Sequence, residues 1–491
     1  MKTLSAIIVI AFFSAAAFAQ AGELDSTFSG DGKVKDGFPA YGYWGSVSAI
    51  AIQPDGKILV ASSDVYVNGA IPNRWTISRY NTDGSFDNDF GYGGAIVSGQ
   101  ETSAVVFSLT VCEDWKIVAV VCMGEFWYST LRFNSNGTFD TSFSAHTFYN
   151  TFNEYAAASQ SDEKVVVGGI MFGGEGFMLI RYTSNGDLDS SFDSNGIVNT
   201  FIGSESGIHA IAIQPDNKIV AGGFTQTGMN TDWALARYNS NGTLDSSFGT
   251  QGIVTTAMSN TTINVIAIQP DGKILASAPG TLTLVRYNSD GSLDTTFGTN
   301  GIVTDSSFES TGSFALQVDG KIVAAGATSD HPHDFALIVL NQDGSIDSSF
   351  GTNGLVTTDF GSNDYPCCVA IAPDRKIVVG GNSSEIELAR YLSEFNVGIL
   401  SFSAPQSSPL VYPNPIQQNE TLEYTLTKDQ TLTITLYDAS GKMVQSFITN
   451  ENRTAGELKE QLKMNENLAV GNYMLTISNG SRSVSVKVTK Q

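Results

Sequence analysis

The sequence predicts an all-β protein in which a seven-bladed β-propeller precedes a small Ig-like β-sandwich. Three observations lead to this fold class. A four-strand pattern recurs about every fifty residues, Asp-Gly and Asn-Gly pairs recur where hairpins turn, and the chain combines 49 Gly and 29 Phe with only 15% charged residues. This composition favours many short strands joined by tight turns, since long surface helices need more Glu, Lys and Arg.

One unit of the repeat covers residues 49–97. An alternating strand at 49–52 meets the turn Gln53-Pro54-Asp55-Gly56, and a second strand follows at 57–61. A third strand ends in Arg79-Tyr80, and the turn at 81–84 leads through an acidic-Phe-Gly segment at 86–91 to a fourth strand at 95–97. Four strands in a unit of this length are typical of a propeller blade.

Two recurring sequence features give the number of units. A lysine opens the second strand at Lys57, Lys116, Lys164, Lys218, Lys273, Lys321 and Lys376. The pair that ends the third strand recurs as Arg79-Tyr80, Arg132-Phe133, Arg181-Tyr182, Arg237-Tyr238, Arg286-Tyr287, the degenerate Val339-Leu340, and Arg390-Tyr391. Both landmarks indicate seven blades.

The last unit is incomplete, and the missing part stands at the other end of the repeat. No acidic-Phe-Gly segment follows Arg390-Tyr391, whereas residues 23–34 carry such a segment without the strands that should precede it. We expect residues 25–34 to pair within the blade of Arg390, because this removes an open sheet edge. Phe28 should then lie near Tyr391.

Each unit also places an Arg before its second turn and an Asp after it, as in Arg237 with Asp245 and Arg286 with Asp294. A half-buried guanidinium needs a partner, so we expect an ion pair within each blade. Closure of the ring would pair Arg390 with Asp25. Unit six departs from the pattern, since Val339 replaces the Arg while Asp347 remains.

The Leu-Asp-x-Ser-Phe-Gly segments at 188–192, 244–249, 293–298 and 346–351, with the Gln-Pro-Asp-Gly-Lys and Arg-Tyr-Asn motifs, resemble the bacterial delta-60 type repeat. The resemblance covers about residues 22–396. It implies a propeller-like structural or binding module, and it assigns no catalytic residue.

Residues 398–409 form an uncharged linker rich in Ser, Pro and Gln, and alternating strands follow at 422–426, 432–437, 443–447, 473–478 and 484–488. Three stretches here resemble the type A sorting domain of the type IX secretion system: Tyr412-Pro413-Asn414-Pro415, residues 436–444, and residues 471–477 with 486–488. The resemblance implies that residues 410–491 are recognised by the type IX secretion machinery and removed near the linker. An ordinary Ig-like domain is the alternative.

Residues 1–19 have the pattern of a signal peptide, with Lys2, an apolar run at 6–13 and a small-residue cleavage site at 17–19. The propeller is therefore expected at 20–397, in a protein that leaves the cytoplasm. The resemblance to the type IX sorting domain implies that it is secreted or held on the outer surface of a Gram-negative bacterium. Eight acidic and eight basic residues cancel after residue 409, so the net charge of −23 belongs to the part before it. This charge argues against nucleic-acid binding, and we expect no membrane span.

Candidate sites are few. His331 and His333, which are flanked by Asp330 and Asp334, could hold a metal. No third ligand is evident, so a solvated loop is favoured. His209 on a strand and His146 in a turn have no partner in sequence. Asn288, Asp290 and Asp294 could bind calcium, although turn capping and the ion pair explain them better.

The four cysteines are expected to be buried free thiols. Cys112 and Cys122 lie at unequal distances from one turn, and Cys367 and Cys368 should point to opposite faces of a strand. We predict no catalytic, cofactor-binding or metal-binding residue and no cofactor.

Two functions follow from these observations. The first is a non-catalytic propeller that binds a glycan or a protein on one face of the ring, and it is not an enzyme. The second is a secreted polysaccharide hydrolase or lyase with carboxylates at the mouth of the propeller. The second requires a deep axial pocket in which two carboxylates lie within about 10 Å, whereas the first requires a shallow face with exposed aromatic side chains.

Overall fold

The structure is a computed structural model that describes residues 21–36, 44–65, 74–98, 104–123, 127–143, 146–149, 152–171, 173, 176–258, 260–382, 385–393, 410–412, 419–426, 429–438, 443–454, 456–465, 468–469, 471–478 and 483–490. The expected signal peptide and linker lie outside these ranges. Every regular element in the described ranges is a β-strand. That part of the chain has no helix with the length and apolar character needed to cross a membrane.

Residues 20–393 form one compact unit with seven antiparallel four-stranded sheets in its described part. Blades 1 to 3 contain β2 (Trp44–Ile52), β3 (Ile58–Val65), β4 (Trp75–Tyr80) and β5 (Ala95–Val97); β6 (Ala104–Val111), β7 (Ile117–Met123), β8 (Trp127–Phe133) and β9 (His146–Tyr149); and β10 (Phe152–Ser159), β11 (Val165–Met171), β12 (Phe177–Tyr182) and β13 (Ile197–Thr200). Blades 4 and 5 contain β14 (Ser206–Ile213), β15 (Ile219–Thr227), β16 (Asn230–Tyr238) and β17 (Ile253–Thr256); and β18 (Val265–Ile268), β19 (Ile274–Ser277), β20 (Leu282–Tyr287) and β21 (Ile302–Asp305). Blade 6 contains β22 (Phe308–Leu316), β23 (Ile322–Thr328), β24 (Phe335–Leu340) and β25 (Leu355–Thr358).

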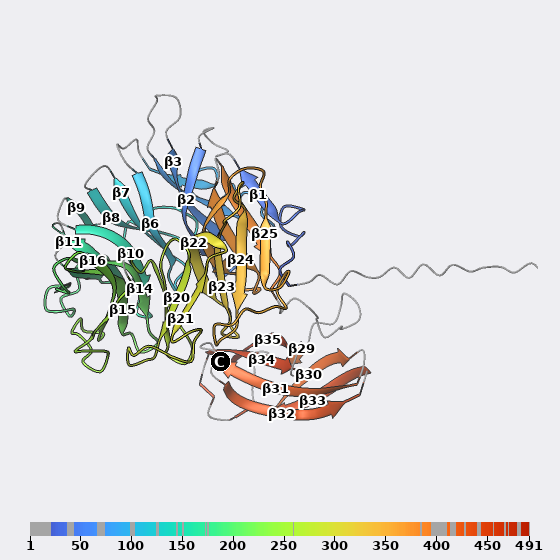
Figure 1. The fold of residues 1–491 in the computed structure, drawn as a ribbon. Coiled ribbons are helices and arrows are strands. Elements are labelled where there is room, and N and C mark those ends of the chain that lie inside the picture. Colours follow the sequence, from blue (N-terminus) through green and yellow to red (C-terminus); the bar gives the residue numbers. More distant parts are fainter. Residues whose placement is uncertain are drawn as a thin grey trace, which may run out of the picture. The chain divides into compact units, whose positions relative to one another are not determined.

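Blade 7 is built from both ends of the unit. It contains β26 (Tyr365–Ile371), β27 (Ile377–Asn382) and β28 (Ile386–Tyr391), and β1 (Lys33–Asp36) is its fourth strand. Lys33 pairs with Ala389, and Leu24 forms a bridge with Tyr391. Figure 1 shows the colours running in order round the ring, with the blue β1 beside the orange strands. The predicted closure is therefore confirmed.

The first strand of each blade lies at the centre of the ring, because it contacts the first strands of the two neighbouring blades. In the described residues, a buried apolar cluster fills the space between each pair of neighbouring blades. The cluster that closes the ring joins Phe28 and Val34 to Val47 of blade 1 and Leu388 of blade 7. Neighbouring sheets thus share their apolar faces, and each blade depends on both neighbours.

Alternating strand direction gives the ring two unlike ends. The hairpin turns between first and second strands and between third and fourth strands lie at one end, which we call the turn face. The connections between second and third strands, and those that lead to the next blade, lie at the other end, the loop face.

On the turn face, the expected Arg–Asp ion pairs are present in blades 1 to 5 and 7. In each, Arg Nε lies 2.7–2.8 Å from Asp Oδ2, and the guanidinium stacks 4.5–4.6 Å from the centre of a Phe ring. Several of these arginines also donate to a carbonyl in the next blade, as Arg79 does to Ser135 O at 2.6 Å. In blade 6, which has Val339 in place of the Arg, Lys321 Nζ binds Asp347 Oδ2 at 2.6 Å. The repeated charges therefore join neighbouring blades.

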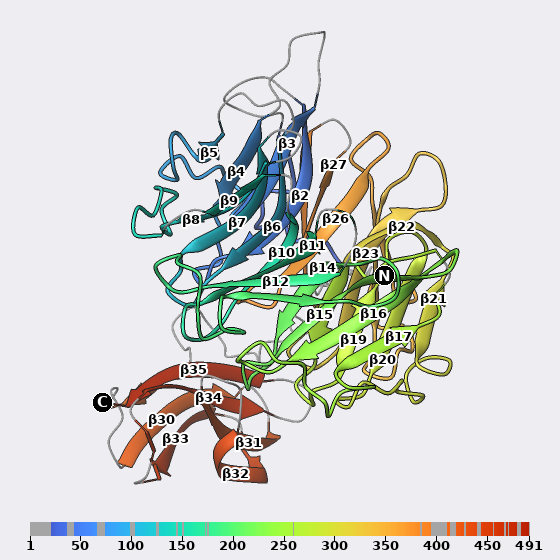
Figure 2. The ribbon, with the colours of Figure 1, turned by 90° about the vertical axis from the view of Figure 1, so that its left-hand side faces the viewer.

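The C-terminal unit is a two-layer β-sandwich (Figure 2). One sheet has the order β29 (Leu410–Tyr412), β30 (Asn419–Leu426), β33 (Gly456–Lys463), and the other has the order β32 (Met443–Arg453), β31 (Gln430–Asp438), β34 (Gly471–Ser478), β35 (Ser483–Lys490). Leu422 of the first sheet and Ile434 and Leu475 of the second share one buried core. β33 was not predicted, because its sequence GELKEQLK is rich in charge, as suits an edge strand.

Candidate functional site

The calcium candidates in blade 5 bond to residues of the turn and of the neighbouring strands. Asn288 Nδ2 donates to Ser292 Oγ, and Asp290 Oδ1 accepts the Ser292 amide at 2.9 Å. Asp294 binds Arg286 and Lys273 through Oδ2 and the Thr296 hydroxyl through Oδ1. Turn capping and the ion pair therefore explain all three side chains, as the sequence indicated.

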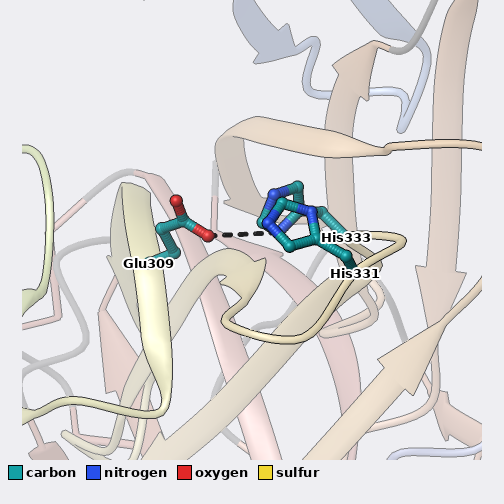
Figure 3. A group of neighbouring side chains, drawn as sticks. All are labelled: Glu309, His331 and His333. Carbon is teal, nitrogen blue, oxygen red and sulfur yellow. Dashed lines mark ion pairs between the residues drawn. The ribbon is translucent and has the colours of Figure 1, made fainter.

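His331 and His333 lie on the loop face, in the connection between β23 and β24, and Glu309 reaches them from β22 (Figure 3). One carboxylate oxygen and one nitrogen of each ring lie within 4.8 Å of one another. The two ring centres are 4.0 Å apart, and Glu309 Oε2 is 3.3 Å from His333 Nδ1. The structure thus supplies the third candidate ligand that sequence reasoning missed.

A β-bulge aims Glu309 at the histidines. The register of β22 against β23 shifts between Phe308 and Ser310, so Glu309 is an extra residue in its strand. A bulge re-aims a side chain away from the plain alternation of the strand. Glu309 also lies far from the histidines in sequence, and we find no signal in the sequence that could have identified it.

His333 is buried and held by three hydrogen bonds. Its amide donates to Asn363 Oδ1 at 3.1 Å, its carbonyl accepts from the Asp364 amide at 2.7 Å, and its Nδ1 lies 2.7 Å from Thr328 O. Because a carbonyl only accepts, Nδ1 carries the proton. The His333 nitrogen nearest Glu309 is therefore a hydrogen-bond donor, so Glu309 and His333 are suited to a structural hydrogen bond. A metal would have to bind the opposite nitrogen of the His333 ring.

Three carboxylates, those of Asp334, Asp359 and Asp364, meet beside this group, with one oxygen of each within 4.8 Å of the others. Burial, and then the charges of Asp359 and Asp364, raise the pKa of Asp334. Asp364 is fully buried and accepts the Phe360 amide at 2.7 Å and the Ser362 hydroxyl at 3.1 Å. Among the described residues, this group brings three carboxylates together on the loop face.

His209 lies on β14, as expected, and it too occupies a bulge. Its ring packs 5.1 Å from Tyr155, whose own ring lies 5.2 Å from Phe107. Tyr155 and Phe107 are the bulge residues of blades 3 and 2. Burial lowers the pKa of His209. His146 begins β9 instead of lying in a turn, because the hairpin of blade 2 closes earlier; its side chain is outside the described part.

The expectation that Cys367 and Cys368 face opposite ways is wrong. Their Sγ atoms lie 2.6 Å apart, because the register of β26 against β27 shifts between Pro366 and Cys368 and breaks the alternation. Cys112 and Cys122 do not face each other, since Cys122 pairs with Val105 while Cys112 follows the end of β6.

At the turn face, the ends of the central strands β2, β6, β22 and β26 enclose a pocket of about 670 Å³. Its wall is mainly apolar and includes Ile52, Val111, Leu316 and Ile371. Of the described residues that line it, Glu113 alone carries a carboxylate. The pair of carboxylates that an axial hydrolytic site requires does not occur in this lining.

The family is shown by models that match the repeated segments and the C-terminal unit. A model described as a domain of unknown function (DUF5122) β-propeller matches residues 53–90, 120–143, 160–192, 214–248, 269–297 and 317–350, and a model of a secretion system C-terminal sorting domain matches residues 410–491. The chain is a DUF5122 β-propeller with a secretion sorting domain. Blade 7, whose parts lie at opposite ends of the propeller sequence, falls outside the matched segments. The sorting domain indicates export and contact with the type IX secretion machinery.

Comparison with solved structures finds chains of low identity and low TM-score. PorZ, described as an essential bacterial surface component of the type-IX secretion system of Porphyromonas gingivalis, is 12% identical, with a TM-score of 0.43 over 90% of this DUF5122 protein and 59% of PorZ. The chain thus corresponds to less than two thirds of the length of PorZ. Sqt1 from Chaetomium thermophilum is 12% identical, with a TM-score of 0.41 over 72% of this chain and 97% of Sqt1. A protein of unknown function from Bacteroides caccae is 12% identical, with a TM-score of 0.36 over 62% and 99% of the two chains. No curated protein matches the chain significantly.

Proposed function

We propose that this protein is an exported, non-catalytic propeller that binds a glycan or a protein on its loop face. The observation that carries the proposal is a set of exposed large apolar side chains in the connections of that face. Their exposed fractions are 47% for Trp127, 66% for Phe201, 101% for Met229 and 41% for Tyr365. Exposed aromatic side chains on a rigid scaffold are typical of binding surfaces.

The two faces differ in a way that supports this choice. The turn face repeats one set of hydrogen bonds and ion pairs from blade to blade, so these charged side chains serve the ring itself. The loop face has connections of different length and composition in each blade, and loops of this kind carry function in many folds. The ligand would therefore contact the loop face.

The proposal is tested with a glycan array and a panel of host and bacterial surface proteins probed with the full chain. Trp127→Ala and Tyr365→Ala are expected to reduce binding at least tenfold, which corresponds to about 1.4 kcal/mol per site. Tyr92→Ala, which removes an aromatic side chain exposed on the turn face, is the matched control and should leave binding unchanged. Equal loss in all three variants would contradict a loop-face ligand.

Delivery to the cell surface is the second part of the proposal. We infer that residues 1–19 direct the chain out of the cytoplasm and that the type IX machinery takes it across the outer membrane of a Gram-negative cell through residues 410–491, with cleavage near residues 398–409. A chain that ends at residue 409 is expected to accumulate inside the cell envelope. Normal release of that truncated chain would contradict the proposal.

The alternative, a polysaccharide hydrolase or lyase, would have to use Asp334, Asp359 and Asp364. An activity screen run on the same polymers as the array separates the two functions. Binding without turnover supports the first, whereas turnover that Asp334→Asn abolishes supports the second.

A further inference from the structure

Cys367 and Cys368 form a pair of adjacent thiols at the centre of the ring. In a regular strand, successive side chains point to opposite faces. In β26 the bulge removes this alternation, and the two Sγ atoms face each other, while Cys367 Sγ also lies 3.4 Å from Gly380 O. The backbone of blade 7 therefore holds the two thiols together.

The bulge itself is a feature of the ring, and only its side chains are special in blade 7. Among the described strands, the matching bulge residues are Ser48, Phe107, Tyr155, His209 and Gly312 in blades 1 to 4 and 6. Because the ring sets the bulge, the thiols do not need to distort the strand in order to meet.

The pair is isolated from the other cysteines. Cys112 and Cys122 belong to blade 2 and are buried there, whereas Cys367 and Cys368 belong to blade 7. An oxidation that starts at Cys367 within one chain can therefore end only at Cys368.

We propose that Cys367 and Cys368 form a disulfide between adjacent residues in the exported protein. This inference relies on the proposed export, because disulfides persist outside the cytoplasm. The oxidant is the disulfide of an envelope thiol oxidase or of a small-molecule thiol. Cys367, which is partly buried, attacks one sulfur of that disulfide as a thiolate and releases a thiol. Cys368 then attacks the Cys367 sulfur and releases the second thiol, so two cysteine protons pass to the two leaving thiolates.

The order of attack follows from the surroundings of the two sulfurs. A hydrogen bond with Cys367, and then burial, raise the pKa of the Cys368 thiol. Cys368 is thus the poorer first nucleophile, and it acts once Cys367 already holds the oxidant.

The bond would be more easily reduced than an ordinary structural disulfide. Adjacent Cα atoms are about 3.8 Å apart across a trans peptide bond, which is closer than disulfides prefer, and strained disulfides are more reducible. The disulfide would also fix the backbone of β26 against blade 6, where a Cβ on Gly312 would come within 2.4 Å of Pro366 O. The pair is therefore a redox-sensitive site whose side chains pack between blades 7 and 1 and whose backbone contacts blade 6.

The test counts thiols in the purified full chain after incubation with glutathione disulfide, acid quenching, unfolding and alkylation. The reduced chain should show four thiols and the oxidised chain two, with the loss mapped by mass spectrometry to the peptide that contains Cys367 and Cys368. The variant in which Cys112 and Cys122 are both Ser should still lose two thiols. Cys367→Ser should abolish the intramolecular loss, and dithiothreitol should restore all four thiols in the native chain.

Four remaining thiols, a loss that maps to Cys112 or Cys122, or stable glutathione adducts in place of the internal bond would each overturn the proposal. Failure of export is a separate result, because it shows as absence of the chain from the cell surface and medium and leaves the thiol count in the purified chain unaffected. In chain recovered from the medium, the pair is expected to be oxidised, and a reduced pair there would also overturn it.

Discussion

Arg390 Nε donates to Asp25 Oδ2 across 2.7 Å, in a buried ion pair between residues that are 365 positions apart in the chain. Lys376 Nζ binds the same oxygen at 2.9 Å, and Arg390 also donates to Thr82 O of blade 1. One carboxylate therefore pairs with two cations at the point where the ring closes. In the other blades that have this ion pair, the Arg and the Asp are close to each other in the sequence.

Asp25→Asn should lower the free energy of unfolding by about 3 kcal/mol, because removing one partner leaves buried charge without compensation. Urea unfolding followed by tryptophan fluorescence measures this change. Glu23→Gln, in an exposed side chain two residues away, should change it by less than about 0.5 kcal/mol. Similar effects of both variants would contradict a specific role for Asp25.

Stability should fall in acid between about pH 4 and pH 2. Burial alone would raise the pKa values of Asp25, Asp140 and Asp189, but hydrogen bonds from neighbouring Ser, Thr or Lys side chains and the Arg charges lower them to about 2. A carboxyl group with a lowered folded-state pKa stabilises the fold above its unfolded value, about 3.9, and loses this contribution as the pH falls through the folded value. Melting temperatures measured at constant ionic strength check this, and a flat profile from pH 5 to pH 2 would contradict it.

The blades could be predicted from sequence because each one repeats the same local rules. The Lys and Arg-Tyr landmarks, the turn glycines and the strand missing from the last unit all lie within short segments, and the closing strand follows from their order. The group of Glu309, His331 and His333 on the loop face could not be predicted. Glu309 and Cys367 owe their directions to bulges, and a bulge depends on the neighbouring strand and leaves no mark on the pattern of polar and apolar residues.

Gly291→Ala should destabilise the protein more than Gly280→Ala does. Both glycines have positive φ, 88° and 99°, so both substitutions carry the same backbone strain. A Cβ at Gly291 would also lie 2.7 Å from Val254 Cγ2 and 3.0 Å from the Gly249 amide, whereas a Cβ at Gly280 meets nothing within 4 Å. We expect a difference of about 1–3 kcal/mol from this overpacking between the turn and its neighbours, measured by urea unfolding. Equal losses would show that conformation alone matters.

The group of Glu309, His331 and His333 is expected not to retain zinc. The proton on His333 Nδ1 serves Thr328 O, which leaves Glu309 beside a donor instead of beside a free ligand atom. Isothermal titration with ZnCl2 should give the same weak heats for the native chain and for the variant with His331→Ala and His333→Ala. Stoichiometric binding that this variant abolishes would contradict the expectation.

The closing strand also determines when the ring can be completed during synthesis of the chain. β1 is made before any other strand, yet its partner β28 is made after all the other propeller strands. The ring therefore stays unfinished until its last hairpin has arrived, however early the middle blades fold. A rearranged chain that began at β2 and carried residues 21–36 after Tyr391 would assemble every blade from contiguous sequence and would need no such delay.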